Sequence, residues 1–112
     1  MIVRQATRDD LIDWFGAVPA TMRAIVCEEG GKIYGVAGIS VMPDHLQAFS
    51  AIKPELRRHK YLMAKAAVMF GRMLDESKTG VLAVCSPTEP TAPDLLTRLG
   101  FRHWADGVWR HG

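Results

Sequence analysis

The sequence predicts a small single-domain α/β protein, and three observations support this prediction. Strand-like and helix-like runs alternate along the 112 residues in the order β-α-β-β-β-α-β-α-β-β. Turns that contain Gly or Pro separate most of these runs, and one helical run is long and strongly apolar. A chain of this length has room for one hydrophobic core, so residues 1–112 are expected to form one domain.

The first half of the chain carries clear boundary signals. Thr7 and Asp10 have the spacing of a capping box, which predicts a short helix that begins after Thr7 and ends near Gly16. Gly30 and Gly31 suit the positive φ angles of a tight hairpin turn. The strands expected in this half cover residues 2–6, 23–28, 32–41 and 47–52.

The second half is predicted to contain a long helix, a strand, a short helix and a closing hairpin. Apolar residues cover most of the circumference of the helix expected at 59–76, so it should pack on the sheet and be covered further by another element or another chain. The continuous apolar run 81–85 suits a central strand that is buried on both faces. Thr91 is expected to cap the last helix, which Gly100 ends, and residues 101–110 should form the hairpin.

Composition and charge argue against several classes of function. A net charge of +2 is too small to favour nucleic acid as a partner, and no apolar stretch reaches the roughly 20 residues of a membrane span. The first residues lack the pattern of a signal peptide. Cys27 and Cys85 lie inside apolar runs and are expected to be buried free thiols in the cytoplasm. The four His residues lack metal-ligand spacing, so no metal site is expected.

Three segments resemble characteristic motifs of the GNAT superfamily of N-acetyltransferases. They are Ile2–Asp10, similar to the opening IRxATxxD, Lys32–Gly38, similar to the strand motif xxVGxxG, and Ala92–Phe101, similar to the ending A…LYxxxGF. The resemblance covers nearly the whole chain and implies a mixed, mostly antiparallel central sheet flanked by about three helices. A fold does not by itself define a function, so any activity depends on the residues at the implied site.

The resemblance implies a cradle for the pyrophosphate of acetyl-CoA between the fourth strand and the long helix, with the pattern (Gln/Arg)-x-x-Gly-x-(Gly/Ala). Arg57 keeps the first position of this pattern, whereas Lys60 and Leu62 replace the two small residues. Small residues let phosphates approach backbone N–H groups at a helix N-terminus, and the branched side chain of Leu62 is expected to obstruct them. The implied cofactor-binding segment is therefore degenerate, and it consists of Arg57, Arg58, His59, Lys60 and Leu62.

A second device implied by the resemblance is also missing. In this family a Tyr of the last helix commonly protonates the departing thiolate of coenzyme A, and the matching position here is Leu96, which has no proton to donate. The Asn that often opens this region falls near Glu89. For an enzyme, Glu28 or Glu89 is the candidate general base.

Three interpretations of the function remain open. The first is a non-catalytic protein without a cofactor, which acts through protein partners or as a homo-oligomer, by its apolar helix 59–76 or its Trp104/Trp109 hairpin. Residues 48–58 and the run to Phe101 resemble short GNAT-like proteins of short-tailed bacteriophages that are related to an internal virion protein. This resemblance implies a virion or assembly role, in the host cytoplasm or the virion. The second interpretation is an acetyl-CoA-dependent N-acetyltransferase, and the third is an anion- or nucleic-acid-binding module at residues 57–60.

Overall fold

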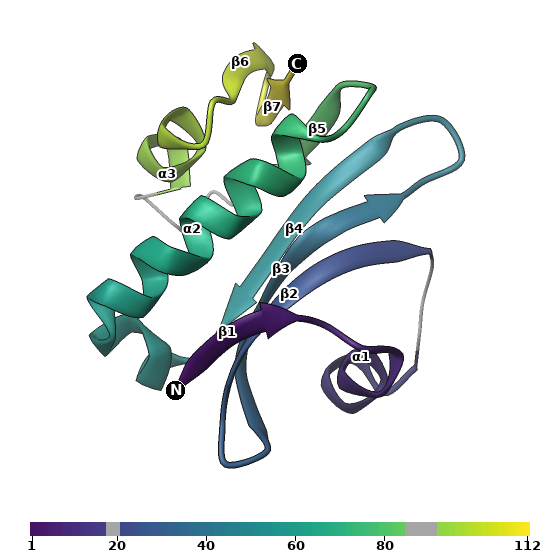
Figure 1. Cartoon of the computed structure of the whole chain (residues 1–112). Coiled ribbons are helices and arrows are strands. Elements are labelled where there is room, and N and C mark those ends of the chain that lie inside the picture. Colours follow the sequence, from purple (N-terminus) through teal and green to yellow (C-terminus); the bar gives the residue numbers. More distant parts are fainter. Residues whose placement is uncertain (18–20, 85–91) are drawn as a thin grey trace.

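The protein is built on one mixed sheet with helices on both of its faces (Figure 1). The computed structural model describes residues 1–17, 21–84 and 92–112, with the backbone alone at 92 and 93. Within these residues, seven strands lie in the order β1-β2-β3-β4-β5-β7-β6. All neighbouring strands are antiparallel except β4 and β5, which are parallel.

The order of elements along the described chain is the predicted one, and the mostly antiparallel sheet with three α-helices is confirmed. The strands are β1 (Ile2–Gln5), β2 (Met22–Glu29), β3 (Lys32–Val41), β4 (Leu46–Ile52), β5 (Val81–Val84), β6 (Arg102–Ala105) and β7 (Val108–His111). The helices are α1 (Arg8–Phe15), the 3-10 helix η1 (Pro54–Arg58), α2 (Lys60–Asp75) and α3 (Ala92–Arg98). Thr91, the expected cap of α3, lies outside the described residues.

Helix α1 begins at a complete capping box, as predicted. The Thr7 hydroxyl accepts a hydrogen bond from the backbone N–H of Asp10 at 3.2 Å, and the Asp10 carboxylate accepts one from the backbone N–H of Thr7 at 2.7 Å. Gly16 ends the helix in the left-handed conformation, with φ 82°, and its N–H donates to the Ile12 carbonyl. These bonds satisfy backbone groups that a helix terminus otherwise leaves without partners.

The tight turn between β2 and β3 is also the predicted one. Gly30 has φ 59° and Gly31 has φ 83°, values that residues with a side chain rarely adopt. The turn sets the register in which Glu29 faces Lys32 across the hairpin.

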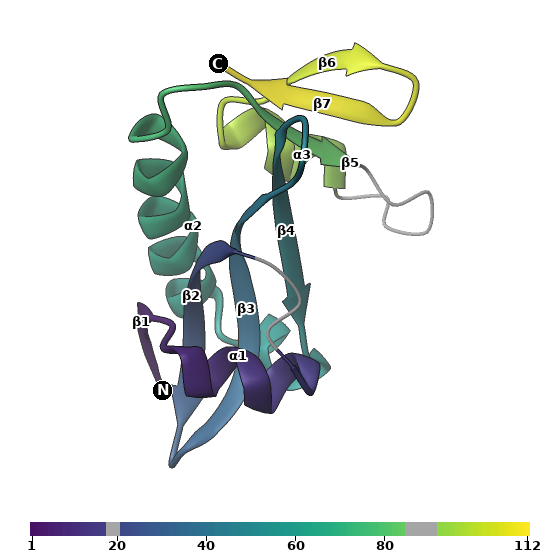
Figure 2. The same ribbon diagram turned by 90° about the vertical axis from the view of Figure 1, so that its right-hand side faces the viewer.

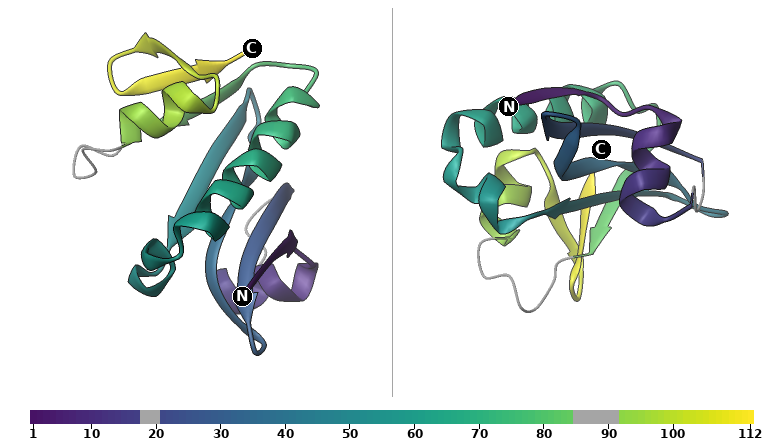
Figure 3. Two further views of the ribbon diagram at one scale, coloured as in Figure 1. Left: turned by 60° about the vertical axis from the view of Figure 1, so that its left-hand side comes forward. Right: turned by 90° about the horizontal axis from the view of Figure 1, so that it is seen from below.

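Two hydrophobic layers cover the two faces of the sheet. On one face α2 and α3 pack over a core that contains Leu74 and Val81 (Figure 3). On the other face α1 packs through Leu11 over β2 and β3, where Val26 is buried. Figure 2 shows α1 in front of the lower part of β2 and β3 and well away from β5, β6 and β7. The face of these last strands that points away from α2 therefore carries no helix of the described chain.

Within the described chain helix α2 buries one face only, so no second element of this chain supplies the further cover that the sequence predicts. Leu62, Phe70 and Leu74 are buried against the sheet, whereas Tyr61 is 85% exposed and Val68 is 57% exposed. The reason is geometric, because a sheet contacts only one stripe of a helix and no second described layer crosses α2. None of the helices in the described ranges has the length and apolar character that crossing a membrane requires.

Strand β5 is likewise buried on one face only, which corrects the prediction for residues 81–85. Val81 and Ala83 are buried under the helices, Leu82 is half-buried, and Val84 is 67% exposed. The side chains of a strand alternate between the two faces of the sheet, and only the face under α2 and α3 is covered here. Cys85 lies outside the described residues.

The predicted closing hairpin is formed by β6 and β7, and it turns at Asp106 and Gly107. Trp109 packs against the core, whereas Trp104 is 54% exposed and stacks with Arg110, the residue after Trp109 on β7. Because adjacent residues of a strand point to opposite faces, Trp104 and Trp109 lie on different sides of the hairpin. They do not form a single aromatic surface.

Gly38 provides a test of the close approach between β2 and β3. A Cβ added at Gly38 would meet the carbonyl oxygen of Arg23 and would lie 2.8 Å from the Cα of Ala24. Because these are backbone atoms of the neighbouring strand, we expect Gly38→Ala to lower the free energy of unfolding by about 1–3 kcal/mol. Urea denaturation measures this change.

Gly71→Ala in α2 is the matched control for that substitution, because nothing lies within 4 Å of the added Cβ. It should raise the free energy of unfolding by about 0.5–1 kcal/mol, since Ala is the better helix former. Effects of the same sign and size at both positions would contradict the strand packing described here.

Candidate functional site

The strands β4 and β5 separate after a short parallel contact. They pair at Leu46–Val81 and Gln47–Leu82, and beyond these pairs β4 continues with β3 alone as its partner. Strand β5 continues with β7 as its partner. We call the region where the two strands move apart the β4–β5 divergence (Figure 2). Along it, residues 48–52 of β4 carry backbone donors and acceptors without a strand partner on the β5 side among the described residues.

The N-terminus of α2 follows directly from β4 through η1, and it is a positively charged place. His59 precedes the helix without forming a side-chain cap, and the first turn contains no acidic residue. Arg57, Arg58, His59 and Lys60 are all exposed, with Glu55 of η1 as the acidic residue of the segment. The first N–H groups of a helix lack partners inside it and carry partial positive charge. The basic side chains are repelled by these N–H groups, and a bound anion would relieve the repulsion. The arrangement therefore favours binding of an anion.

Leu62 does not project from this helix start. Its side chain is 8% exposed and packs into the core under α2, together with Phe70 and Leu74. The expected obstruction of phosphates by Leu62 therefore loses its physical basis, because the branched side chain points to the sheet. Whether this segment binds a phosphate stays a prediction.

Leu96, at the position of the expected proton donor, is also a core residue. It is half-buried against the cluster that contains Phe101 and Val81. The structure therefore provides no proton donor at this position of α3. Glu89, one candidate base, lies outside the described residues.

Glu28, the other candidate base, is held in an ion-pair network away from the β4–β5 divergence. Its strand β2 lies between β1 and β3, so β3 separates it from β4 and the divergence. The Arg4 guanidinium donates to Glu28 at 2.9 Å and to both carboxylate oxygens of Asp10 at 2.6 and 2.9 Å. The bonds to Arg4 hold the pKa of Asp10 well below its ordinary value. This network joins β1, β2 and α1, and its geometry suits a structural role.

A second group of polar residues, which the sequence did not single out, lies where β4 and β5 are still paired. The Asp44 carboxylate lies 2.6 Å from Nδ1 of His45, and the side-chain oxygen of Gln47 lies 3.2 Å from Nε2. The bond to Asp44 raises the pKa of His45 above its ordinary value, with Gln47 adding to the effect. The one signal in the sequence that could have found this group is the pair of Asp44 and His45 just before a predicted strand.

Cysteine and metal chemistry find no support in the described residues. Cys27 is a buried free thiol, as predicted, and burial raises its pKa, which keeps it protonated at neutral pH. No group of three or more His, Cys, Asp or Glu side chains within the described ranges could hold a metal ion.

Several solved structures with a similar arrangement of strands and helices are described as acetyltransferases. The ribosomal-protein-S18-alanine N-acetyltransferase from Escherichia coli matches with a TM-score of 0.65 and 14% identity, over 97% of this chain and 91% of the other. A GNAT superfamily phosphinothricin acetyltransferase from Sinorhizobium meliloti, in complex with AcCoA, matches with a TM-score of 0.63 and 16% identity, over 97% and 86%. An N-acetyltransferase from Staphylococcus aureus Mu50 matches with a TM-score of 0.63 and 14% identity, over 93% and 84%.

The protein therefore has the GNAT acetyltransferase fold, as its sequence motifs imply. In sequence, no family model and no curated protein matches the chain. Identities this low establish the fold alone, so the residues of the chain must carry any conclusion about function.

The contact between Asp44 and His45 can be tested by its pH dependence. We expect the imidazole of His45 to titrate above the ordinary value of about 6.5, and Asp44→Asn to bring the pKa back towards that value. The pair stabilises the fold below about pH 6.5, and this contribution is lost as the pH rises through the pKa of His45 in the folded protein. At the acidic end it is lost as Asp44, whose pKa is lowered by His45, becomes protonated.

Proton NMR of the His45 ring measures these pKa values directly. Gln47→Ala is the graded control and should lower the pKa of His45 by less than Asp44→Asn does, because Asp44 makes the larger contribution. An unchanged titration midpoint in Asp44→Asn would contradict the contact.

Proposed function

We propose that this protein binds acetyl-CoA along the β4–β5 divergence and transfers the acetyl group to an amine. The observation that carries the proposal is the continuity of two features. The unpaired edge of β4 at residues 48–52 leads through η1 to the uncapped, cationic N-terminus of α2. The structurally similar protein from Sinorhizobium meliloti was solved in complex with AcCoA, and this similarity of fold supports acetyl-CoA as the cofactor proposed here.

The phosphate end of the cofactor fits the start of α2. Exposed Arg58 and Lys60 offer side-chain charge, and the first N–H groups of the helix offer hydrogen bonds to phosphate oxygens. The buried side chain of Leu62 belongs to the core and therefore does not stand in the way of a phosphate at these N–H groups. Small residues normally let phosphates come close to the backbone N–H groups. Here the charges of Arg58 and Lys60 would provide part of the attraction instead.

The amide-containing arm of coenzyme A fits the edge of β4. An extended chain with amide groups can add to an exposed strand edge by backbone hydrogen bonds, as in β-augmentation. When bound, the cofactor supplies an activated acetyl thioester. Direct attack by an amine then needs chiefly an oriented thioester and a base, so Leu96 does not exclude transfer. Glu89 remains a candidate base, whereas Glu28 is engaged by Arg4.

A second candidate function is the non-catalytic protein that acts through protein contacts. The observation in its favour is that Leu96 belongs to the core while apolar Tyr61 and Val68 stand exposed on α2. The more specific role in a virion or its assembly is supported only by the resemblance of the sequence to the bacteriophage proteins. This candidate needs no cofactor.

Calorimetric titration with acetyl-CoA separates the two candidates. We expect micromolar binding by the wild-type protein and a loss of at least about tenfold in affinity for the Arg58→Glu/Lys60→Glu double variant, because two favourable charges become repulsive. Lys65→Glu is the matched control, since Lys65 is exposed on α2 more than one turn beyond the first residues and should leave the affinity nearly unchanged.

The absence of wild-type binding at millimolar acetyl-CoA would reject the proposal and favour the non-catalytic candidate. Equal effects of the double variant and Lys65→Glu would show that the helix N-terminus is not the binding place. Release of free coenzyme A thiol in the presence of a panel of amines then tests the transfer itself.

A further inference from the structure

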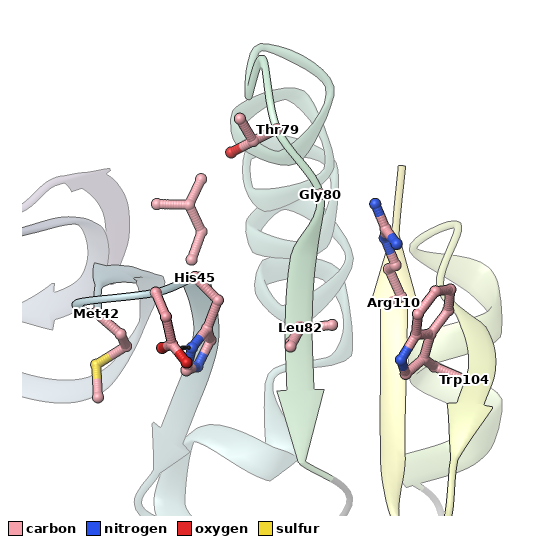
Figure 4. A pocket seen from close by; sticks show the side chains of 9 residues that line it. Met42, His45, Thr79, Gly80, Leu82, Trp104 and Arg110 are labelled. Atoms are coloured by element: carbon pink, nitrogen blue, oxygen red, sulfur yellow. Dashed lines mark hydrogen bonds and ion pairs between the residues drawn. The ribbon is translucent and has the colours of Figure 1, made fainter.

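A pocket of about 450 Å³ lies on the face of the sheet that points away from α2, beside the closed end of the β4–β5 divergence. Its floor is Leu82 of β5, with His45 and Met42 on the β4 side and Arg110 and Trp104 on the hairpin side (Figure 4). This part of the sheet carries no helix of the described chain, so the pocket opens directly to solvent.

Arg110 is the positive charge of this pocket, and it is held in place by packing contacts. Its guanidinium stacks on the ring of Trp104 at 4.6 Å. On another side the guanidinium and Nε lie over Gly80, where an added Cβ would come within 2.6 Å of Nε. Among the described residues Arg110 makes no ion pair, so its hydrogen-bond donors remain available to a ligand.

The other charged residues that line the pocket offset one another. Asp44 is paired with His45 at 2.6 Å, so together they add little net charge when His45 is protonated. With His45 protonated, the pocket therefore carries about one net positive charge, that of Arg110. Leu82, Leu46 and Met42 supply apolar surface, and the exposed indole of Trp104 supplies a flat aromatic wall.

We infer that this pocket binds a small organic monocarboxylate with an apolar or aromatic body, through Arg110. A planar guanidinium matches a carboxylate with two parallel hydrogen bonds, and the apolar lining matches the rest of such a molecule. The volume is in the range of small-molecule sites. The pocket is distinct from the cationic start of α2, which lies at the other end of β4.

The position of the pocket gives the carboxylate a role. Leu82 lines the pocket and belongs to the last residue pair, Gln47–Leu82, before β4 and β5 separate. A ligand anchored at Arg110 thus lies next to the closed end of the divergence, where an acceptor amine has to meet the thioester. This role of the ligand as the acetyl acceptor rests on the proposed function, whereas carboxylate binding at Arg110 does not.

The test is a titration with N-acetyl-L-phenylalanine and with its amide, which lacks the carboxylate. The indole N–H signal of Trp104 in NMR spectra reports on the pocket directly. We expect the acid to bind and the amide to bind at least about tenfold more weakly, because one charge-assisted pair is lost. Arg110→Met should lower the affinity for the acid by the same factor. Arg98 is exposed on α3, so Arg98→Met should leave the affinity unchanged.

Gly80→Ala provides a second variant that leaves the charge in place. The added methyl group displaces the Arg110 side chain. It should therefore lower the affinity for the acid, but by less than Arg110→Met does. Equal binding of acid and amide, an unaffected Arg110→Met protein, or no wild-type binding at millimolar acid would each overturn the inference. If the wild-type protein binds acetyl-CoA but not the acid, this inference is contradicted and the proposed function is not, because the two measurements depend on different residues.

A tripeptide that ends in a free phenylalanine carboxylate distinguishes two sources of the same chemistry. Tighter binding of the tripeptide supports a peptide C-terminus as the natural ligand. Tighter binding of the N-acetyl amino acid supports a free small acid. Either result requires the carboxylate and Arg110.

Discussion

The short parallel contact between β4 and β5 is the constraint on which the rest of this structure depends. Two residue pairs hold these strands together, and beyond Gln47 and Leu82 each strand has a partner on one side only within the part of the chain that the structure describes. The contact divides the sheet into a four-stranded part and a three-stranded part, and it leaves the far half of β4 with a free edge. Both proposed sites depend on this geometry. One extends along the free edge to the start of α2, and the other lies where the strands are still paired.

Charge placement separates structural from functional ionic groups in this protein. Arg4, Asp10 and Glu28 satisfy one another at hydrogen-bond distance and join β1, β2 and α1, so they have little capacity left for a ligand. Lys60 and Arg110 are the contrasting cases. The first lies at an uncapped helix start, and the second is stacked on Trp104 without an acidic partner among the described residues. A cation whose charge is not balanced locally is the better candidate for binding an anion.

Local signals in the sequence predicted local structure well. The capping box of Thr7 and Asp10, the stop at Gly16 and the turn at Gly30 and Gly31 depend on backbone hydrogen bonds and φ angles within a few residues, and all are as expected. Burial was predicted less well. The apolar circumference of α2 and the apolar run of β5 indicated burial on more than one side, yet Tyr61 and Val84 are exposed, because burial depends on which elements cross a residue and not on its own character.

The sequence by itself determined the order of elements, the turns and, through three short motifs, the GNAT fold, since each of these is encoded in neighbouring residues. It also located the basic segment at residues 57–60. Only the tertiary structure decided that Leu62 points into the core, that Glu28 is bound by Arg4, and that His45 and Arg110 line one pocket. The physical reason is that side-chain direction and contacts across strands depend on the register and pairing of segments far apart in the chain. His45 and Arg110 are 65 positions apart in the sequence, yet they line the same pocket because β4, β5 and β7 lie side by side in the sheet.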